Sequence, residues 1–312
     1  MKSRPFKQVD VFGAAPYLGN PLAVVLDGTH LSSDEMQHFA RWTNLSETSF
    51  LLPPSPEGAA HGADYRVRIF TPGAELPFAG HPTLGTCHAW LEAGGTPGAR
   101  HEIVQECEVG LIRIRREVTG LAFAAPKLVR SDPDAVMLAQ VAAALGLKLL
   151  QIKAAQVLNN GPVWLGLLLD SRHSVLQLTP DHLALKNLGQ KVGVVAFQYA
   201  PAHPVLIGRS NREARAFAAP SREAVTTALA APEVEVRAFA APVGVDEDPV
   251  TGSLNASLAQ WLIADGLAPR NYIASQGCAL GRAGRVHIAQ DDAHQVWVGG
   301  ASVTCINGSA NL

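Results

Sequence analysis

The sequence predicts an α+β fold of two pseudo-symmetric halves, each a curved, mostly antiparallel sheet around a central helix. First, many short apolar runs suited to strands are interrupted by few helical patterns. Second, the order of features in residues 70–95 recurs in residues 239–266, and Gly80 reappears 172 residues later as Gly252. Two repeats are too few for a solenoid or a propeller. We therefore expect a duplicated protein whose site lies in the cleft between its halves.

The second copy of the repeat predicts an anion site. An expected strand at residues 234–239 leads into a loop with three consecutive acids, Asp246, Glu247 and Asp248. The following helix has one apolar face, made by Leu254, Leu258, Trp261 and Leu262. We expect Ser253 to be its N-cap and Gly266 to end it. The unpaired backbone N–H groups of the helix start then face the acidic loop and favour an anion.

The other elements follow from alternation and from turn residues. We expect further strands at residues 6–12, 22–26, 45–52, 65–70, 101–107, 111–116, 120–124, 163–169, 192–199, 205–208, 213–217, 273–276, 285–288, 296–299 and 302–306. We expect further helices from Ser32 to Asn44, from Gly80 to Gly94, from an Asp132 N-cap to Leu145, and from Thr179 onward. Residues 53–64 are expected to form a surface loop.

The domain boundaries follow from the repeat. Residues 125–133 are the expected crossing between the halves. We predict an N-terminal half of residues 1–125, completed by a C-terminal strand at 300–312, and a C-terminal half of residues 126–299.

Composition limits the classes of function. The chain has 312 residues, of which 47% are apolar and 17% charged, which is typical of a soluble globular protein. A net charge of −2 without a basic run argues against nucleic acid as a partner. The longest apolar stretches are too short to cross a membrane. The polar N-terminus lacks the apolar core of a signal peptide, so we expect a cytoplasmic protein.

The sequence offers no motif for a metal or a cofactor. Its four cysteines lie far apart without a CxxC pair, and its histidines show no HxH or HxxxH spacing. Neither GxGxxG after a strand nor GxxxxGK[ST] occurs. We expect neither a metal nor a cofactor.

Three titratable residues are candidates for proton transfer. Glu47 lies on an expected strand among apolar residues, where an acid needs a partner or a function; the alternative is an edge-strand acid facing water. His81 at a helix start is either a cap or a neutral proton acceptor. Asp248 is held extended by Pro249, although three acids in a row usually form a solvated loop. Two carboxyl groups facing one cavity would separate their pKa values into an acid and a base.

Five segments together resemble the PhzF-like phenazine-biosynthesis isomerase family over essentially the whole chain: GNPLAVVL, NLSETSF, FTPGAELPFAGHPTLG, GVDEDPVTGS and the SQG…GRAGRVHI…VWVGG tail. That family is similar in fold to diaminopimelate epimerase. The resemblance implies a homodimer of two-domain subunits and cofactor-free proton-shuttle chemistry. In the characterised member, a trans-2,3-dihydro-3-hydroxyanthranilate isomerase, the Glu of N-x-S-E-T moves a proton between ring carbons.

The resemblance assigns roles to residues of this chain. Glu47 matches the proton-transferring Glu, and His81 and Asp248 match its supporting groups. Backbone N–H groups at the two helix starts would hold the substrate carboxylate, with Gly80, Gly252, Thr251 and Ser253 as the substrate-binding residues. One departure concerns the substrate: members usually read GSA after the acidic loop, whereas Leu254-Asn255 here puts bulk and an amide near the helix start.

The predicted function is an isomerase acting on a small carboxylated metabolite. One alternative is an epimerase or lyase on an amino-acid-like substrate, and another is a non-catalytic small-anion-binding protein. The epimerase relatives use a Cys pair at the two helix starts, whereas those positions here are Gly80-His81 and Gly252-Ser253. We expect Cys87 and Cys278 to be core or supporting residues, so a two-thiol racemase is disfavoured.

Overall fold

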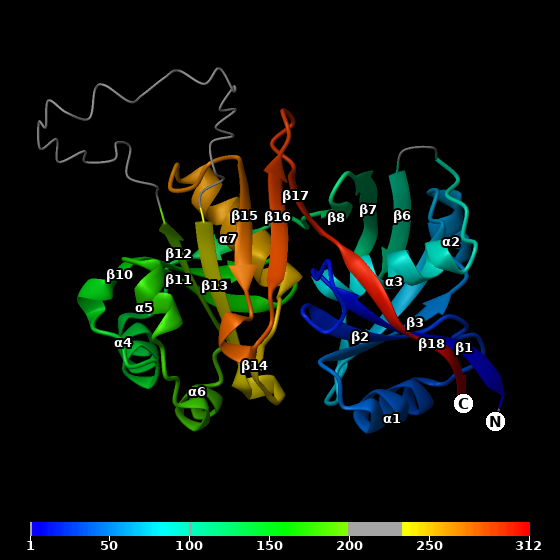
Figure 1. The fold of residues 1–312 in the computed structure, drawn as a ribbon, viewed down its shortest axis with the longest axis horizontal. Helices are drawn as coiled ribbons and strands as arrows, with labels where there is room; N and C mark the ends of the chain where they lie inside the picture. Colours follow the sequence, from blue (N-terminus) through cyan, green and yellow to red (C-terminus); the bar gives the residue numbers. More distant parts are fainter. Residues whose placement is uncertain (1, 100–101, 199–232) are drawn as a thin grey trace, which may run out of the picture.

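A computed structural model describes residues 2–99, 102–198 and 233–312, and its strands form one hydrogen-bonded network of 18 strands. Figure 1 shows two lobes side by side, with both chain ends on the lobe that contains β1. The first lobe contains β1 (Ser3–Val11), β2 (Asn20–Val25), β3 (Glu47–Leu52), β4 (Tyr65–Phe70), β5 (Glu75–Leu76), β6 (Glu102–Cys107), β7 (Gly110–Glu117), β8 (Gly120–Ala124) and β18 (Ser302–Asn311). The second contains β9 (Val129–Ser131), β10 (Ile152–Asn159), β11 (Val163–Leu169), β12 (Val192–Gln198), β13 (Glu233–Ala240), β14 (Val245–Asp248), β15 (Asn271–Gln276), β16 (Gly284–Gln290) and β17 (Val296–Gly300).

The two lobes repeat one order of strand pairing. In the first, β1 and β2 are antiparallel, β2 and β3 parallel, β3 and β4 antiparallel, and β4 and β6 parallel. In the second, β10 and β11 are antiparallel, β11 and β12 parallel, β12 and β13 antiparallel, and β13 and β15 parallel. Two further antiparallel pairings complete each series. The α+β prediction of two duplicated, sheet-rich halves is confirmed.

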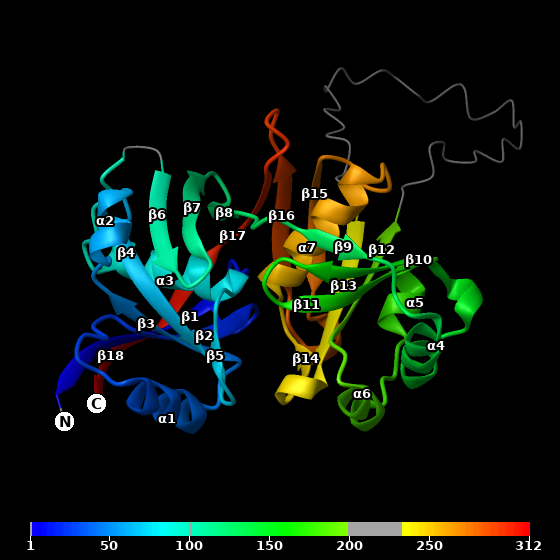
Figure 2. The ribbon, with the colours of Figure 1, turned by 180° about the vertical axis from the view of Figure 1, so that it is seen from behind.

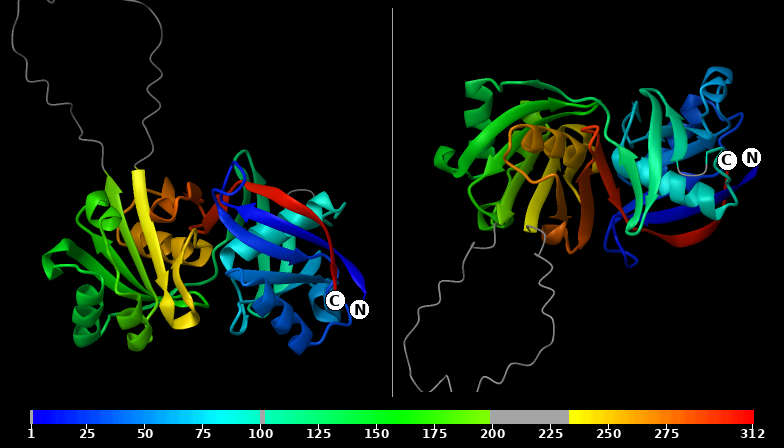
Figure 3. Two further views of the ribbon diagram at one scale, coloured as in Figure 1. Left: turned by 60° about the horizontal axis from the view of Figure 1, so that its bottom comes forward. Right: turned by 90° about the horizontal axis from the view of Figure 1, so that it is seen from above.

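Each curved sheet surrounds one helix. The central helices are α3 (Gly80–Glu92) and α7 (Gly252–Ala264), both 13 residues long. Figure 3 shows each of them enclosed by strands when the molecule is seen from above. We expected one apolar face on the second helix, but nearly every residue of α7 is buried, as a fully enclosed helix requires. Leu84 of α3 and Leu254 of α7 belong to one apolar core.

The lobes are joined by strands as well as by the chain. Antiparallel pairing of β8 with β17 connects the two sheets. The chain leaves the first lobe after β8, and β9 pairs with β10 of the second; Figure 2 shows this crossing from behind. At the far end of the sequence, β18 returns to pair with β1. The domain boundaries given above stay a prediction.

Several expected elements differ from the structure. The segment expected as a surface loop contains α2 (Pro56–Ala60), and the expected crossing contains β9. The acidic loop is in part a strand, β14, and α5 (Arg172–Leu176) was not expected. Strands expected at 205–208 and 213–217 lie outside the described residues. The remaining helices are α1 (Ser33–Thr43), α4 (Ala135–Ala144) and α6 (His182–Leu188).

Two predicted helix caps are each wrong by two residues. The N-cap of α4 is Asp134, whose carboxylate accepts from the Met137 N–H, and not Asp132. The N-cap of α7 is Thr251, which makes no side-chain capping bond, and Ser253 lies inside the first turn. In both cases two suitable polar residues lie two positions apart, and the sequence does not show which of them is the cap. No helix in the described part of the chain is long and apolar enough to cross a membrane.

Candidate active site

A cavity of about 300 Å³ lies where residues of both lobes meet. This volume is at the lower end of the range for small-molecule sites. The first lobe contributes Ser46, Glu47, Thr71, Gly73, Ala74, Leu76 and Ala79. The second contributes Pro162, Trp164, Lys191, Ala240, Pro242, Val243, Val245, Asp248, Thr251 and Ser253. The expected position of the site, between the halves, therefore holds a cavity that contains both predicted carboxyl groups.

Glu47 lines this cavity and faces His81, which is not among the lining residues. Glu47 is the first residue of β3, and His81 lies in the first turn of α3, so His81 is not the N-cap, which is Ala79. The Nε2 of His81 is 3.3 Å from the Oε2 of Glu47. Both atoms are buried without a hydrogen bond to any described residue. Because Glu47 lines the cavity, its carboxyl is placed to exchange a proton with a bound molecule, and the unpaired His81 nitrogen lies next to that carboxyl.

Burial sets the protonation of this pair. It raises the pKa of Glu47 well above its usual value, and the nearby Asp248 carboxyl raises it further, while Lys191 lowers it. Burial also lowers the pKa of His81 to about 3. His81 is therefore neutral near pH 7, and we assign its proton to Nε2 because Nδ1 lies 3.3 Å from the Asn20 amide nitrogen. A neutral histidine thus faces a carboxyl group that can hold a proton.

Asp248 is positioned by residues that are distant in the sequence. The Nδ2 of Asn20 donates to Oδ1 of Asp248 at 2.8 Å and to the Val250 carbonyl at 2.9 Å. The Thr251 hydroxyl donates to Oδ2 at 2.6 Å. Burial nevertheless raises the pKa of Asp248 to about 6, although the hydrogen bonds from Thr251 and Asn20 act in the opposite direction. Two carboxyl groups with raised pKa values therefore share the cavity.

A buried amide network fixes the start of α7. The Nε2 of Gln276 donates to the Asp248 carbonyl and to the Thr251 hydroxyl, both at 3.0 Å. The Oε1 of Gln276 accepts from the Thr251 N–H at 3.0 Å and from the Asn255 amide at 2.8 Å. Sequence reasoning missed Asn20 and Gln276. A weak signal existed for Gln276, because Gln105 occupies the matching place in the first repeat and bonds Thr83 of α3.

The Leu254-Asn255 departure does not reach the cavity. Asn255 is buried and its amide donates to the Thr251 carbonyl as well as to Gln276. Leu254 is fully buried, and its side chain packs directly over Gly193 of β12, where an added Cβ would lie 2.2 Å from it. The departure therefore supports the helix start and the sheet, and its bulk does not shape the cavity wall.

The starts of the two central helices touch. A Cβ placed on Gly80 would lie 2.7 Å from the Gly252 Cα, and one placed on Gly252 would lie 2.9 Å from the Gly80 Cα. Neither helix start has a side-chain cap, and their neighbours Ala79, Thr251 and Ser253 line the cavity. Two positive helix ends with free backbone N–H groups therefore converge beside one cavity, as an anion site requires.

The raised pKa of Asp248 makes a prediction about stability. The folded state holds the Asp248 proton more tightly than the unfolded chain does. The contribution of this proton to the free energy of unfolding is therefore complete below about pH 4 and is lost as pH rises through about 6. We expect Asp248→Asn to gain in free energy of unfolding over wild type by on the order of 3 kcal/mol between pH 4 and 7. Urea unfolding across this range measures the difference. The exposed Asp246→Asn is the matched control, and parallel curves for Asp248→Asn and wild type would contradict the prediction.

Trp164 and Lys191 line the cavity and were not predicted as site residues from the sequence. Trp164 follows the first residue of β11, and Lys191 directly precedes β12. The Lys191 ammonium lies 5.0 Å from the centroid of the Trp164 ring, within cation–π range. Burial lowers the pKa of Lys191, and the Glu47 carboxyl opposes that change. Lysine and tryptophan at strand starts carry no motif, so only their shared cavity distinguishes them.

Other candidate residues lie elsewhere. Asp246 is exposed, and Glu247 forms an ion pair with Arg237 at 2.8 Å, so only the last of the three consecutive acids enters the cavity. Glu75, the acid of the first repeat, is paired with Arg68 on the surface. Cys87 is buried in the core as expected. Cys278 is exposed, so its expected place in the core or beside the site is wrong.

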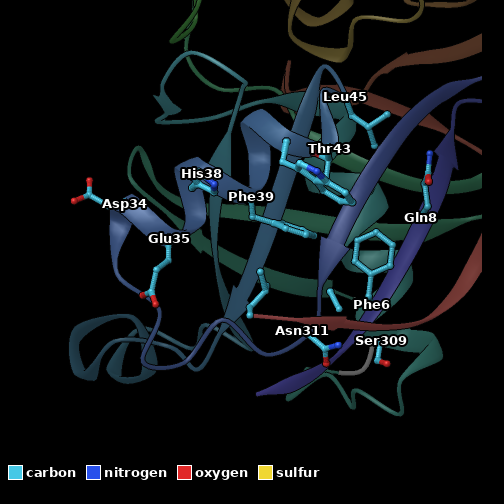
Figure 4. A pocket seen from close by; sticks show the side chains of 13 residues that line it. Phe6, Gln8, Asp34, Glu35, His38, Phe39, Thr43, Leu45, Ser309 and Asn311 are labelled. Carbon is cyan, nitrogen blue, oxygen red and sulfur yellow. The ribbon is translucent and has the colours of Figure 1, made fainter. Parts of the chain in front are cut away.

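A larger hollow of about 1030 Å³ lies on the first lobe, formed by β1, α1 and the end of β18. Figure 4 shows its lining, with Phe6 and Phe39 on its floor and Asp34 and Glu35 at its rim. The Glu35 carboxylate caps α1 by accepting from the Ser32 N–H at 2.8 Å, and this hydrogen bond lowers the Glu35 pKa. Because Asp34 and Glu35 are both exposed and Glu35 is engaged in capping, this hollow lacks the paired buried acids of the inner cavity.

The fold and the cavity together define a class: duplicated α+β proteins in which two enclosed helices start beside one interlobe cavity. Solved structures of that class match over nearly the whole chain. A PhzF-family protein of Bacillus anthracis has a TM-score of 0.76, 20% identity and complete coverage of both chains. A hydroxyproline epimerase of Agrobacterium vitis has a TM-score of 0.59 and 13% identity, covering 98% of this chain and 92% of its own. At these identities the likeness concerns the fold.

The chain belongs to the phenazine biosynthesis-like protein family, whose model matches residues 9–308. Antisense-enhancing sequence 1 of Schizosaccharomyces pombe is 32% identical over 99% of both chains. The trans-2,3-dihydro-3-hydroxyanthranilate isomerase of Pseudomonas fluorescens is 36% identical over 57% of this chain and 62% of its own. Because this family is one of isomerases, the protein is an enzyme of the isomerase class.

Proposed function

We propose that this protein is a cofactor-independent isomerase that moves a proton within a small carboxylated metabolite. The observation that carries the proposal is the buried contact of Glu47 with His81, 3.3 Å apart, beside a cavity that Glu47 and Asp248 both line. General acid–base chemistry requires such groups within reach of the substrate and shielded from water. The assignment of Glu47, His81 and Asp248 as catalytic residues is part of this proposal.

The substrate carboxylate binds at the two helix starts. Backbone N–H groups around Gly80 and Gly252 supply donors that need no reorganisation when the substrate enters. Thr251 and Ser253 line the adjoining wall, which suits them to contact the bound molecule. Charge that develops on the substrate when a proton leaves carbon is stabilised by the same positive helix ends.

Glu47 transfers the proton. As a carboxylate it removes a proton from one carbon, leaving the electron pair delocalised on the substrate and a neutral carboxylic acid at Glu47. The acid form of Glu47 then delivers a proton to another carbon, and exchange of that proton with solvent before delivery introduces deuterium in deuterated water. No redox partner is required. The raised pKa of Glu47 favours both steps near neutral pH. Neutral His81 lies 3.3 Å from the Glu47 carboxyl, and the Asp248 carboxyl raises the Glu47 pKa, so both support the transfer.

Exchange of substrate hydrogen with solvent tests the proposal. Wild-type protein is incubated in deuterated water with trans-2,3-dihydro-3-hydroxyanthranilate, the compound named for one relative, and with carboxylated analogues. We expect deuterium at carbon in at least one compound, read by NMR, with a product isomeric with the substrate. Inversion at one carbon without migration would identify an epimerase instead, and loss of water or ammonia would identify a lyase.

A binding protein without catalysis is the remaining alternative. It would raise the melting temperature with these carboxylates and show no exchange with any of them. A homodimer, which the family resemblance implies, is also proposed, and the molar mass in solution from light scattering tests it.

A further inference from the structure

The inner cavity contains a basic residue with no role in the chemistry above. Among the described residues that line it, Lys191 is the only one with a basic side chain. Its ammonium forms no ion pair or hydrogen bond with the rest of the described chain, and the side chain is only partly exposed. The Glu47 carboxyl acts on Lys191 only at a distance, without a direct ion pair. A half-buried ammonium without a directly paired anion is unfavourable, and a bound ligand could supply that anion.

The position of Lys191 repeats the position of Glu47. In the first lobe Thr48 of β3 pairs with Phe70 of β4, and Glu47 precedes Thr48. In the second lobe Val192 of β12 pairs with Phe239 of β13, and Lys191 precedes Val192. Each of these strands is also parallel to the strand before it. The duplicated fold therefore presents an acid from one half and a base from the other, both at the start of the equivalent strand and both at one cavity.

Neighbouring groups favour anion binding by Lys191. The Trp164 ring lies 5.0 Å from the Lys191 ammonium and holds it without neutralising its charge. Trp164 is 4% exposed, and its indole N–H has no hydrogen-bond partner among the described residues. An unpaired buried donor beside an unpaired cation matches an anionic oxygen group better than an amine or a hydrocarbon.

We propose that Lys191, supported by Trp164, binds a second anionic oxygen group of the substrate, so that the natural substrate is a small dicarboxylate. The first carboxylate lies at the helix starts, close to Gly80 and Gly252. The second carboxylate lies against the wall of the second lobe. Glu47, on the opposite wall, then faces the carbon skeleton between the two groups. This inference depends on the proposed function for the first carboxylate and extends it to the substrate class.

Binding of matched aromatic acids tests the proposal without requiring turnover. Benzoate carries one carboxylate, and phthalate, isophthalate and terephthalate add a second one at three separations on the same ring. Isothermal titration calorimetry at pH 7 gives the dissociation constants. We expect at least one diacid to bind wild type about tenfold to a hundredfold more tightly than benzoate, the effect of one charge-assisted hydrogen bond. Lys191→Met should remove this preference and leave benzoate affinity unchanged within about threefold.

Control variants keep the test decisive. Lys191→Arg should keep part of the preference, and Lys186→Met, on the exposed surface of α6, should keep all of it. Trp164→Phe should weaken the diacid selectively. The inference is overturned if no diacid binds wild type more tightly than benzoate, or if Lys191→Met weakens benzoate and the diacids equally.

The two proposals fail separately. Preference for a diacid that depends on Lys191, without deuterium exchange in any carboxylate, would contradict the isomerase and retain the binding site. Deuterium exchange by wild type without any diacid preference would retain the isomerase and remove Lys191 from substrate recognition.

Discussion

Glu47→Gln is expected to reduce deuterium exchange into substrate by at least about a thousandfold, within the range that a general acid–base group contributes. Glutamine keeps the shape of the side chain and cannot accept a proton from carbon. The fold should survive, because the replaced carboxyl is buried with its Oε2 unpaired among the described residues. NMR in deuterated water measures exchange, and thermal unfolding checks the fold.

Glu75→Gln is the matched control for this experiment. Glu75 is exposed, and its ion pair with Arg68 lies away from the cavity, so this variant should exchange at the wild-type rate. A Glu47→Gln protein that exchanges substrate hydrogen as fast as wild type would remove Glu47 from the mechanism. In that case Asp248 would be the next group to test, since it is the other buried carboxyl of the cavity.

Gly252→Ala is expected to abolish most activity and to lower the free energy of unfolding by about 1–3 kcal/mol, the usual cost of overpacking. The Cβ of an alanine at position 252 would lie 2.9 Å from the Gly80 Cα and 3.0 Å from the His81 backbone nitrogen. These neighbours are backbone atoms that cannot rotate away, so the two helix starts must separate. Their N–H groups would then no longer converge on one anion, and His81 would move relative to Glu47.

Gly308→Ala is the control for this substitution. Gly308 lies in β18, and a Cβ there meets no atom within 4 Å. Chemical denaturation and the exchange assay should leave this variant indistinguishable from wild type. If Gly252→Ala behaves in the same way, the close approach of the helices is not needed for the site.

The helices at the centre of the fold could be predicted because glycine marks both of their ends. Gly80 and Gly252 lie where two backbones nearly touch, and Gly94 and Gly266 have positive φ after the last turn. Both are requirements that other residues meet poorly, so they remain visible after the rest of the two repeats has diverged. For the same reason the duplication of the two halves could be inferred from one sequence.

The supporting residues of the site could not be predicted. Asn20 bonds Asp248 across 228 positions of sequence, and nothing near Asn20 indicates a partner that remote. A polar residue at the start of a strand is usually interpreted as part of a turn, and only the folded structure shows that Asn20 is buried. Lys191 was missed because a lone lysine before a strand is typical of a solvated edge. The correspondence of Lys191 with Glu47 becomes visible only when the strand pairings of the two halves are compared.

The positions of β9 and β18, each paired with a strand of the opposite repeat, indicate how such a chain arose. The strand that follows β8 completes the sheet of the second lobe, and the strand that follows β17 completes the sheet of the first. Each repeat therefore lends its last strand to the other, which is the arrangement of a strand-swapped dimer whose two subunits have become one polypeptide. A single ancestral repeat would have been an incomplete sheet with half a site. Pairing with a copy of itself would have supplied the missing strand and the other half of the site. Only after the two copies were fused could their sequences differ, so that one has an acid, Glu47, at the start of its third strand and the other has Lys191.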